Sequence, residues 1–102
     1  MSTLERSDLL SRVRDKRDAI LAAAARNHAG NVRVFGSVAR GTSDSASDVD
    51  FLVDLEPGAS LFDLGALQSE LTDLLSLEVD LVTAAGLRSE LRDRVLFEAV
   101  PL

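Results

Sequence analysis

The chain has 102 residues, of which 46% are hydrophobic and 27% charged, and its formal net charge is −6. The composition is typical of a soluble globular protein, and the length favours a single domain over residues 1–102. The negative charge argues against direct nucleic-acid binding, because contacts with phosphates need a basic surface. The absence of cysteine excludes disulfides and thiolate metal sites.

The N-terminal sequence MSTLERSDLL is charged early and lacks the apolar segment of a signal peptide. No run approaches the roughly eighteen apolar residues that a membrane span needs. A chain without cysteine also fits a reducing compartment. These features predict a cytoplasmic protein with no membrane partner.

The first predicted element is a helix at about residues 7–27, because Val13, Ile20 and Ala24 fall on one helical face. A β-branched and aromatic run at 32–35 predicts a first strand. Gly36-Ser37 ends this strand, and one helical turn is expected before a polar loop at 42–47.

A second strand is predicted at 48–55, where Phe51 and Val53 alternate with Asp48 and Asp50 on the opposite face. A second helix starts at Ser60, which forms a capping-box pattern with the residue three positions on. A third strand follows at 78–83, and a last helix lies within about 84–99. The chain therefore predicts an α/β domain with a three-stranded mixed sheet covered by helices, whose catalytic core spans about 31–83.

Asp48 and Asp50 project from the same face of their strand and repel each other unless a positive charge lies between them. Oxygen ligands without His or Cys favour Mg²⁺ or Mn²⁺. The helical crossover between the second and third strands predicts a parallel pair, which places Asp80 beside these carboxylates. If the first two strands are antiparallel, Gly36-Ser37 reaches the same edge of the sheet.

Such an edge suits phosphoryl-type transfer, in which two metal ions hold the attacking and leaving oxygens. Gly36 allows a phosphate to approach the backbone closely. The turn at Ser37 offers N–H groups and a hydroxyl to phosphate oxygens. Arg40, one turn further on, is placed to neutralise a leaving pyrophosphate.

Gly36-Ser37, ten intervening residues and Asp48-Val49-Asp50 resemble the signature of the DNA polymerase β-like nucleotidyltransferases. The fuller text VRVFGSVARGTSDSASDVDFLVDL, followed by VDLVT, resembles the minimal nucleotidyltransferase family. The resemblance implies transfer of a nucleoside monophosphate from an NTP, with release of pyrophosphate. It implies that Asp48 and Asp50 bind two Mg²⁺ ions and that Asp80 completes one metal site and helps deprotonate the acceptor.

The resemblance further implies that Gly36 and Ser37 contact the triphosphate and that Arg40 matches a frequent basic position. Many proteins of this family are antitoxins paired with a HEPN-type RNase toxin. The antitoxin of such a type VII pair transfers AMP from ATP to a tyrosine of the toxin. ATP and a toxin of this kind are therefore the expected partners. The sequence leaves open whether the chain forms a homo- or hetero-oligomer.

Other interpretations remain beside this one. The Asp48 and Asp50 pair can be a solvated strand end, Ser37 can cap its turn, and Arg40 can pair with a nearby acid. Asp54 lies roughly 13 Å beyond Asp50 at 3.3 Å per residue, which favours a surface acid. For function, the alternatives are an antitoxin that neutralises its toxin by binding alone and a nucleotidyltransferase for a small-molecule acceptor.

Overall fold

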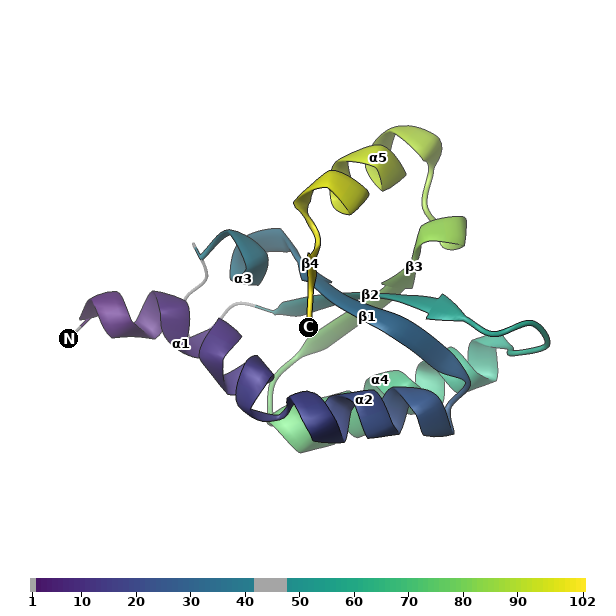
Figure 1. Cartoon of the computed structure of the whole chain (residues 1–102), viewed down its shortest axis with the longest axis horizontal. Coiled ribbons are helices and arrows are strands. Elements are labelled where there is room, and N and C mark those ends of the chain that lie inside the picture. Colours follow the sequence, from purple (N-terminus) through teal and green to yellow (C-terminus); the bar gives the residue numbers. More distant parts are fainter. Residues whose placement is uncertain (1, 42–47) are drawn as a thin grey trace.

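The computed structural model describes the backbone of residues 2–41 and 48–102, and the side chains of residues 9–41 and 48–102. The polar loop expected at 42–47 lies outside the described residues. Figure 1 shows a sheet with helices α2 and α4 along one face and α5 beyond the other. In the described part of the chain, no helix has the length and apolar character needed to cross a bilayer.

The N-terminal segment forms two helices, α1 (Ser2–Asp15) and α2 (Arg17–Arg26), where the sequence predicted one. The chain leaves the helical conformation at Lys16, whose N–H donates to the carbonyl of Val13 three residues back. Both helices contribute to the core: Val13 of α1 and Ile20 of α2 are fully buried. The apolar pattern continues across the interruption between the two helices, and no glycine or proline marks it, so the sequence predicted one helix.

The sheet has the strand order β3-β2-β1-β4. Strands β1 (Ala29–Phe35) and β2 (Val49–Leu55) are antiparallel, and β2 is parallel to β3 (Val79–Thr83). The parallel pair confirms the expectation from the helical crossover, and the antiparallel pair fulfils the condition set for the first two strands. They bring the end of β1 and the starts of β2 and β3 to one edge of the sheet.

The sheet contains four strands rather than the predicted three. The additional strand β4 (Val100–Pro101) follows the last helix and pairs antiparallel with β1 at Val34 and Arg33. Two residues are too few to show an alternating pattern, and proline is tolerated on an edge strand. This strand anchors the end of the chain beside β1.

Helix α4 (Leu61–Leu75) makes the crossover between the two parallel strands. Ser60 caps it as predicted: the Ser60 hydroxyl accepts from a backbone N–H, and the Asp63 carboxylate accepts from the Ser60 N–H at 2.9 Å. Apolar residues of this helix meet the inward faces of the strands in the core. The fully buried residues here include Val34, Phe51, Val53 and Leu67.

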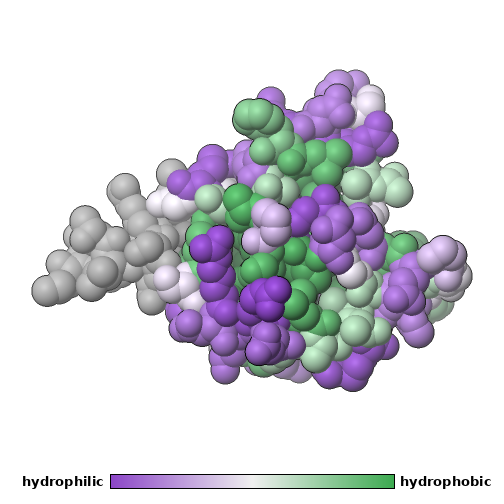
Figure 2. Space-filling view, in the orientation of Figure 1, coloured by the Kyte–Doolittle hydropathy of each residue, from purple (hydrophilic) through white to green (hydrophobic). Residues whose placement is uncertain are grey.

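The C-terminal segment contains the predicted last helix, preceded by a short turn that was not predicted. A short 3-10 helix, η1 (Ala84–Gly86), is followed by extended backbone at Leu87 and Arg88, and α5 runs over Ser89–Glu98. The Thr83 hydroxyl accepts the Gly86 N–H at 3.1 Å, which closes η1 as a separate turn. Figure 2 shows exposed apolar side chains at the top of the molecule, where α5 lies; this helix leaves Phe97 94% exposed.

Candidate active site

The carboxylates named from the sequence lie at the edge where β1 ends and the parallel pair begins. Asp50 on β2 is the register partner of Phe35 on β1 and of Asp80 on β3. Neighbouring strands are about 4.8 Å apart, so Asp50 and Asp80 are adjacent on the sheet. Asp48 stands two residues before Asp50, immediately ahead of the strand. Asp48 and Asp80 are exposed, whereas Asp50 is partly buried.

This gathering of negative charge changes the acidity of the central carboxyl. The pKa of Asp50 is raised from 3.8 to about 6 by burial and then by the charges of Asp80 and Asp48. A side-chain hydrogen bond with Asp80 and the charge of Glu98 add to the rise. Burial is the largest cause of the raised pKa, and the neighbouring negative charges disfavour the ionised form further. A divalent cation would relieve the same repulsion.

The carboxylates do not form a ready-made metal cage. Among residues 9–41 and 48–102, no three His, Cys, Asp or Glu side chains already converge on one point. Asp48 and Asp80 are exposed, which leaves room for their side chains to turn toward a cation. The donor set of carboxylate oxygens alone is the type that Mg²⁺ and Mn²⁺ bind. The residues therefore fit a hard divalent cation in their chemistry and their position.

Gly36 brings the backbone against the central carboxyl. It has φ +74°, and a β carbon added to it would stand 2.2 Å from Oδ2 of Asp50. Only glycine adopts this φ at little cost and also leaves that space empty. Ser37 follows in the first turn of α3 (Gly36–Arg40) and is partly buried. The structure thus brings Gly36-Ser37 to the carboxylate edge, as the strand pairings predicted.

Arg40 at the end of α3 forms an ion pair with Glu98 on α5. The Glu98 Oε1 atom accepts from Arg40 Nη1 at 2.7 Å and from the Gly36 N–H at 2.6 Å. The expected alternative for Arg40, a pairing with a nearby acid, is therefore realised, although its partner comes from the other end of the chain. The Arg40 side chain is still 53% exposed.

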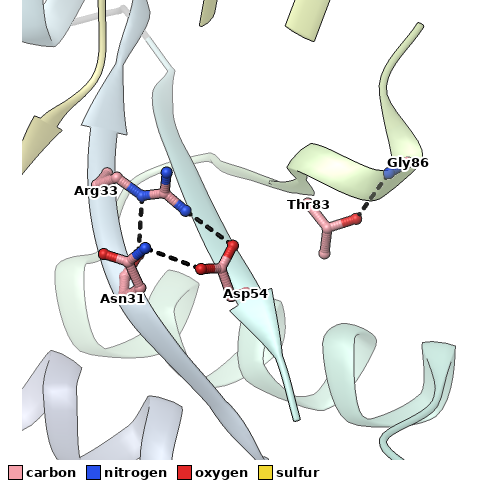
Figure 3. Close-up of polar contacts among 5 residues, drawn as sticks. All are labelled: Asn31, Arg33, Asp54, Thr83 and Gly86. Carbon is pink, nitrogen blue, oxygen red and sulfur yellow. Dashed lines mark hydrogen bonds and ion pairs between the residues drawn. The ribbon is translucent and has the colours of Figure 1, made fainter. Parts of the chain in front are cut away.

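Asp54 lies further along β2 and has structural partners of its own (Figure 3). Its carboxylate accepts from Arg33 Nη2 at 2.9 Å and from Asn31 Nδ2 at 2.8 Å. The Arg33 side chain is 13% exposed, so this carboxylate balances a charge that is largely withdrawn from water. Asp54 is therefore explained by the strand pair β1–β2 and is not drawn into the group at the strand start.

Comparison with known proteins agrees with this geometry. The family model of the nucleotidyltransferase domain matches residues 17–102, which is most of the chain. The chain belongs to the nucleotidyltransferase domain family. The match includes every candidate residue at the carboxylate edge and confirms the resemblance seen in the sequence.

Relatives of this nucleotidyltransferase extend the comparison. Protein adenylyltransferase MntA of Thermococcus cleftensis is 45% identical over 69 residues, which cover 68% of this chain and 70% of that protein. A solved structure described as a candidate minimal nucleotidyltransferase is 47% identical, with a TM-score of 0.83, and the match covers 91% of this chain and 95% of that one.

A more distant crystal structure, of a toxin–antitoxin with AMP-PNP, has a TM-score of 0.71 at 23% identity. The match covers 82% of this chain and 69% of that one. At this identity the similarity shows the fold alone. The mixed sheet and helices of this nucleotidyltransferase are thus those of the minimal members of the family.

One residue at the site of this nucleotidyltransferase was missed by sequence reasoning. Glu98 lies 62 residues from Gly36 and 58 from Arg40, and nothing near it in the sequence points to either partner. Its place follows from the path of α5 and from β4, which returns the chain to β1. Only the tertiary structure reveals this contact.

Proposed function

We propose that this protein is a Mg²⁺-dependent protein adenylyltransferase that transfers AMP from ATP to a hydroxyl group of a partner protein. The observation that carries the proposal is the register that pairs Asp50 with Asp80 at the edge of the sheet, where β2 begins directly after Asp48. The name of the Thermococcus cleftensis relative, a protein adenylyltransferase, supports the choice of group and acceptor.

In this proposal the three carboxylates have different roles in metal binding and proton transfer. Asp48 and Asp50 hold two Mg²⁺ ions, with Mn²⁺ as a substitute, and Asp80 completes one of the two sites. When bound, the ions would neutralise the charge of the phosphates and act as Lewis acids. Asp80 also accepts the proton of the acceptor hydroxyl, whose oxygen bonds to the α-phosphorus as the bond to the pyrophosphate oxygen breaks.

The turn after β1 holds the other end of the nucleotide. Gly36 leaves the backbone open beside Asp50, where any side chain would collide with the carboxylate. Gly36 and Ser37 contact the triphosphate, and Arg40 stabilises the charge on the departing pyrophosphate, since guanidinium groups match phosphate oxygens. The chain thereby orients the α-phosphate toward the carboxylate edge.

The acceptor proposed here is a tyrosine of a HEPN-type RNase toxin, which makes this protein the antitoxin of a type VII pair in the cytoplasm. Two observations support this partner. Solved structures of similar fold are described as toxin–antitoxin complexes, one of them with AMP-PNP. The nearer relatives are named as enzymes that act on proteins.

Label transfer from α-labelled ATP into host proteins tests the proposal. Wild type, Asp50→Asn and the control Asp73→Asn are incubated with Mg²⁺ and lysate that contains the partner. Asp73 is an exposed aspartate of α4 that lines a hollow against α2 beside Ala22 and Arg26, away from the carboxylate edge. We expect one labelled protein with wild type and Asp73→Asn, and none with Asp50→Asn.

Two results would contradict the proposed enzymatic activity. Equal labelling by Asp50→Asn and wild type would remove the central carboxyl from the reaction. Protection of cells from the toxin by Asp50→Asn, with no label in the toxin under any condition, would instead establish neutralisation by binding alone.

A further inference from the structure

The carboxylate of Glu98 joins two donors that both belong to the turn after β1. One oxygen atom, Oε1, accepts from the Gly36 N–H at 2.6 Å and from Arg40 Nη1 at 2.7 Å. Both contacts have the short distances of charge-assisted hydrogen bonds. The Glu98 side chain is only 20% exposed, so water screens the ion pair less than at an open surface.

The first consequence concerns Arg40. A free arginine side chain samples many rotamers, and fixing it costs free energy whenever it grips a ligand. The contact with Glu98 fixes the guanidinium before any nucleotide arrives. It uses one nitrogen of a group that carries five N–H donors, and Arg40 has no other ion pair with the described residues. Donors therefore remain for phosphate oxygens.

The second consequence concerns Gly36. Its backbone lies against Asp50, because a β carbon there would stand 2.2 Å from the Asp50 carboxylate. A hydrogen bond to the Gly36 N–H therefore fixes the turn relative to the carboxylate edge as well as to α5. The same oxygen atom of Glu98 thus ties together the phosphate-binding turn, the basic residue and the C-terminal helix.

We propose that Glu98 is a positioning residue for nucleotidyl transfer, which holds the turn at Gly36 and the Arg40 guanidinium in place for the triphosphate of the incoming nucleotide. The inference rests on the proposed function, in which this turn and Arg40 contact the triphosphate. In this role Glu98 acts through its hydrogen bonds to Gly36 and Arg40.

The opposite role is that of a plug, in which the Glu98 carboxylate occupies donors that the triphosphate needs. The two roles predict opposite changes in nucleotide affinity when the carboxylate is removed. Positioning is favoured because Arg40 remains 53% exposed while it contacts Glu98, so its other donors stay open to a ligand.

The test compares Glu98→Ala and Glu98→Gln with the matched controls Glu90→Ala and Glu90→Gln. Glu90 is an exposed glutamate in the first turn of the same helix. Calorimetry measures binding of a non-hydrolysable ATP analogue with Mg²⁺, and steady-state transfer to the partner protein gives KM for ATP and kcat. Circular dichroism confirms that each variant is folded.

We expect Glu98→Ala to weaken analogue binding about tenfold and to raise KM for ATP by a similar factor, an effect of about 1.4 kcal/mol. Glu98→Gln keeps an oxygen acceptor and should lose less, about threefold. The Glu90 variants should bind as wild type does. Should Glu98→Ala fail to fold, Glu98→Gln is nearly the same shape and carries the test alone.

A double-variant comparison asks whether Glu98 acts through Arg40. Arg40→Ala and Arg40→Ala/Glu98→Ala should bind the analogue within about threefold of each other. Once Arg40 is absent, Glu98 has no guanidinium left to position, so its removal changes little. The NMR signal of the Arg40 Nε–H measures how well this side chain is ordered in the protein without nucleotide. It should be distinct in wild type and exchange-broadened in Glu98→Ala.

Tighter binding by Glu98→Ala would overturn positioning in favour of the plug. Unchanged analogue binding by Glu98→Ala would also overturn the positioning role, and so would fully additive effects in the double variant. In either case, transfer by the wild-type protein would leave the proposed function intact. Wild type that binds no nucleotide and transfers none would overturn the proposed function, and this inference with it.

Discussion

Gly36 on the turn after β1 lies so close to Asp50 on β2 that no β carbon fits between them, since it would stand 2.2 Å from Oδ2. We therefore expect Gly36→Ala to push the Asp50 carboxylate aside. The positive φ of this residue adds roughly 1–2 kcal/mol of strain for any L side chain. Transfer should fall at least tenfold, and thermal unfolding should shift to lower temperature.

Gly65 is the matched control for this substitution. It lies inside α4, and a β carbon there meets nothing within 4 Å. Gly65→Ala should keep full transfer and stabilise the protein by about 0.5–1 kcal/mol, because alanine is the better helix former. Equal transfer by the two alanine variants would show that the close approach of Gly36 and Asp50 does not matter for activity.

The acidity of Asp50 predicts how stability depends on pH in the metal-free protein. Its pKa is raised from 3.8 to about 6, first by burial and then by Asp80 and Asp48. The protonated form is thus favoured in the folded state. The resulting stabilisation is complete below about pH 3.8 and is lost as the pH rises through about 6. Because Asp50 is partly exposed, solvent screening reduces the effect to about 1 kcal/mol.

Asp50→Asn removes this pH-dependent contribution. With a chelator present, we expect the variant to be more stable than wild type at pH 7.5 by about the same 1 kcal/mol, and the difference to vanish near pH 4. Urea unfolding at both pH values measures it. A variant less stable than wild type at pH 7.5 would show that the Asp50 carboxylate is not under repulsion.

A divalent cation should offset the loss of stability that the ionised Asp50 carboxylate causes. Saturating Mg²⁺ at pH 7.5 should raise the melting temperature of wild type and of Asp73→Asn, because a ligand that binds only the folded state stabilises it. Asp50→Asn should gain little. The effect of Mg²⁺ should weaken as the pH falls below about 6, where a proton competes for Asp50. An identical Mg²⁺ response in Asp50→Asn would place the cation elsewhere.

Asp54 shares a strand with Asp50 but should behave differently. Asp54→Ala breaks the ion pair with Arg33, which is largely withdrawn from water, and the hydrogen bond from Asn31, which should cost about 1–3 kcal/mol of stability. The transfer rate of the folded variant should stay within about twofold of wild type. A loss comparable to that of Asp50→Asn would extend the site along the whole length of β2.

Several features were predictable from the sequence because local physics determines them. The alternation of apolar and acidic residues on β2, the cap at Ser60 and the crossover that makes β2 and β3 parallel each depend on short-range patterns. Together they were enough to predict that Asp50 and Asp80 are neighbours, which the register confirms.

The features that were missed depend on contacts between distant segments. The break at Lys16 has no marker in the sequence. Strand β4 is too short to show an alternating pattern, and it pairs with the free edge of β1. The pairing of Glu98 with Arg40 arises from the same return of the chain to β1. A raised pKa at Asp50 likewise requires three-dimensional proximity and cannot be read from spacing.

The most direct test of the account is the intact mass of the purified partner protein after incubation with this chain, ATP and Mg²⁺. The account predicts a mass increase of whole AMP units on the partner, mapped to a hydroxyl side chain. The increase should be absent with Asp50→Asn or with a chelator and present with Asp73→Asn. A partner whose mass does not change, although it binds the folded wild-type protein and loses its activity, would contradict adenylyl transfer as the function.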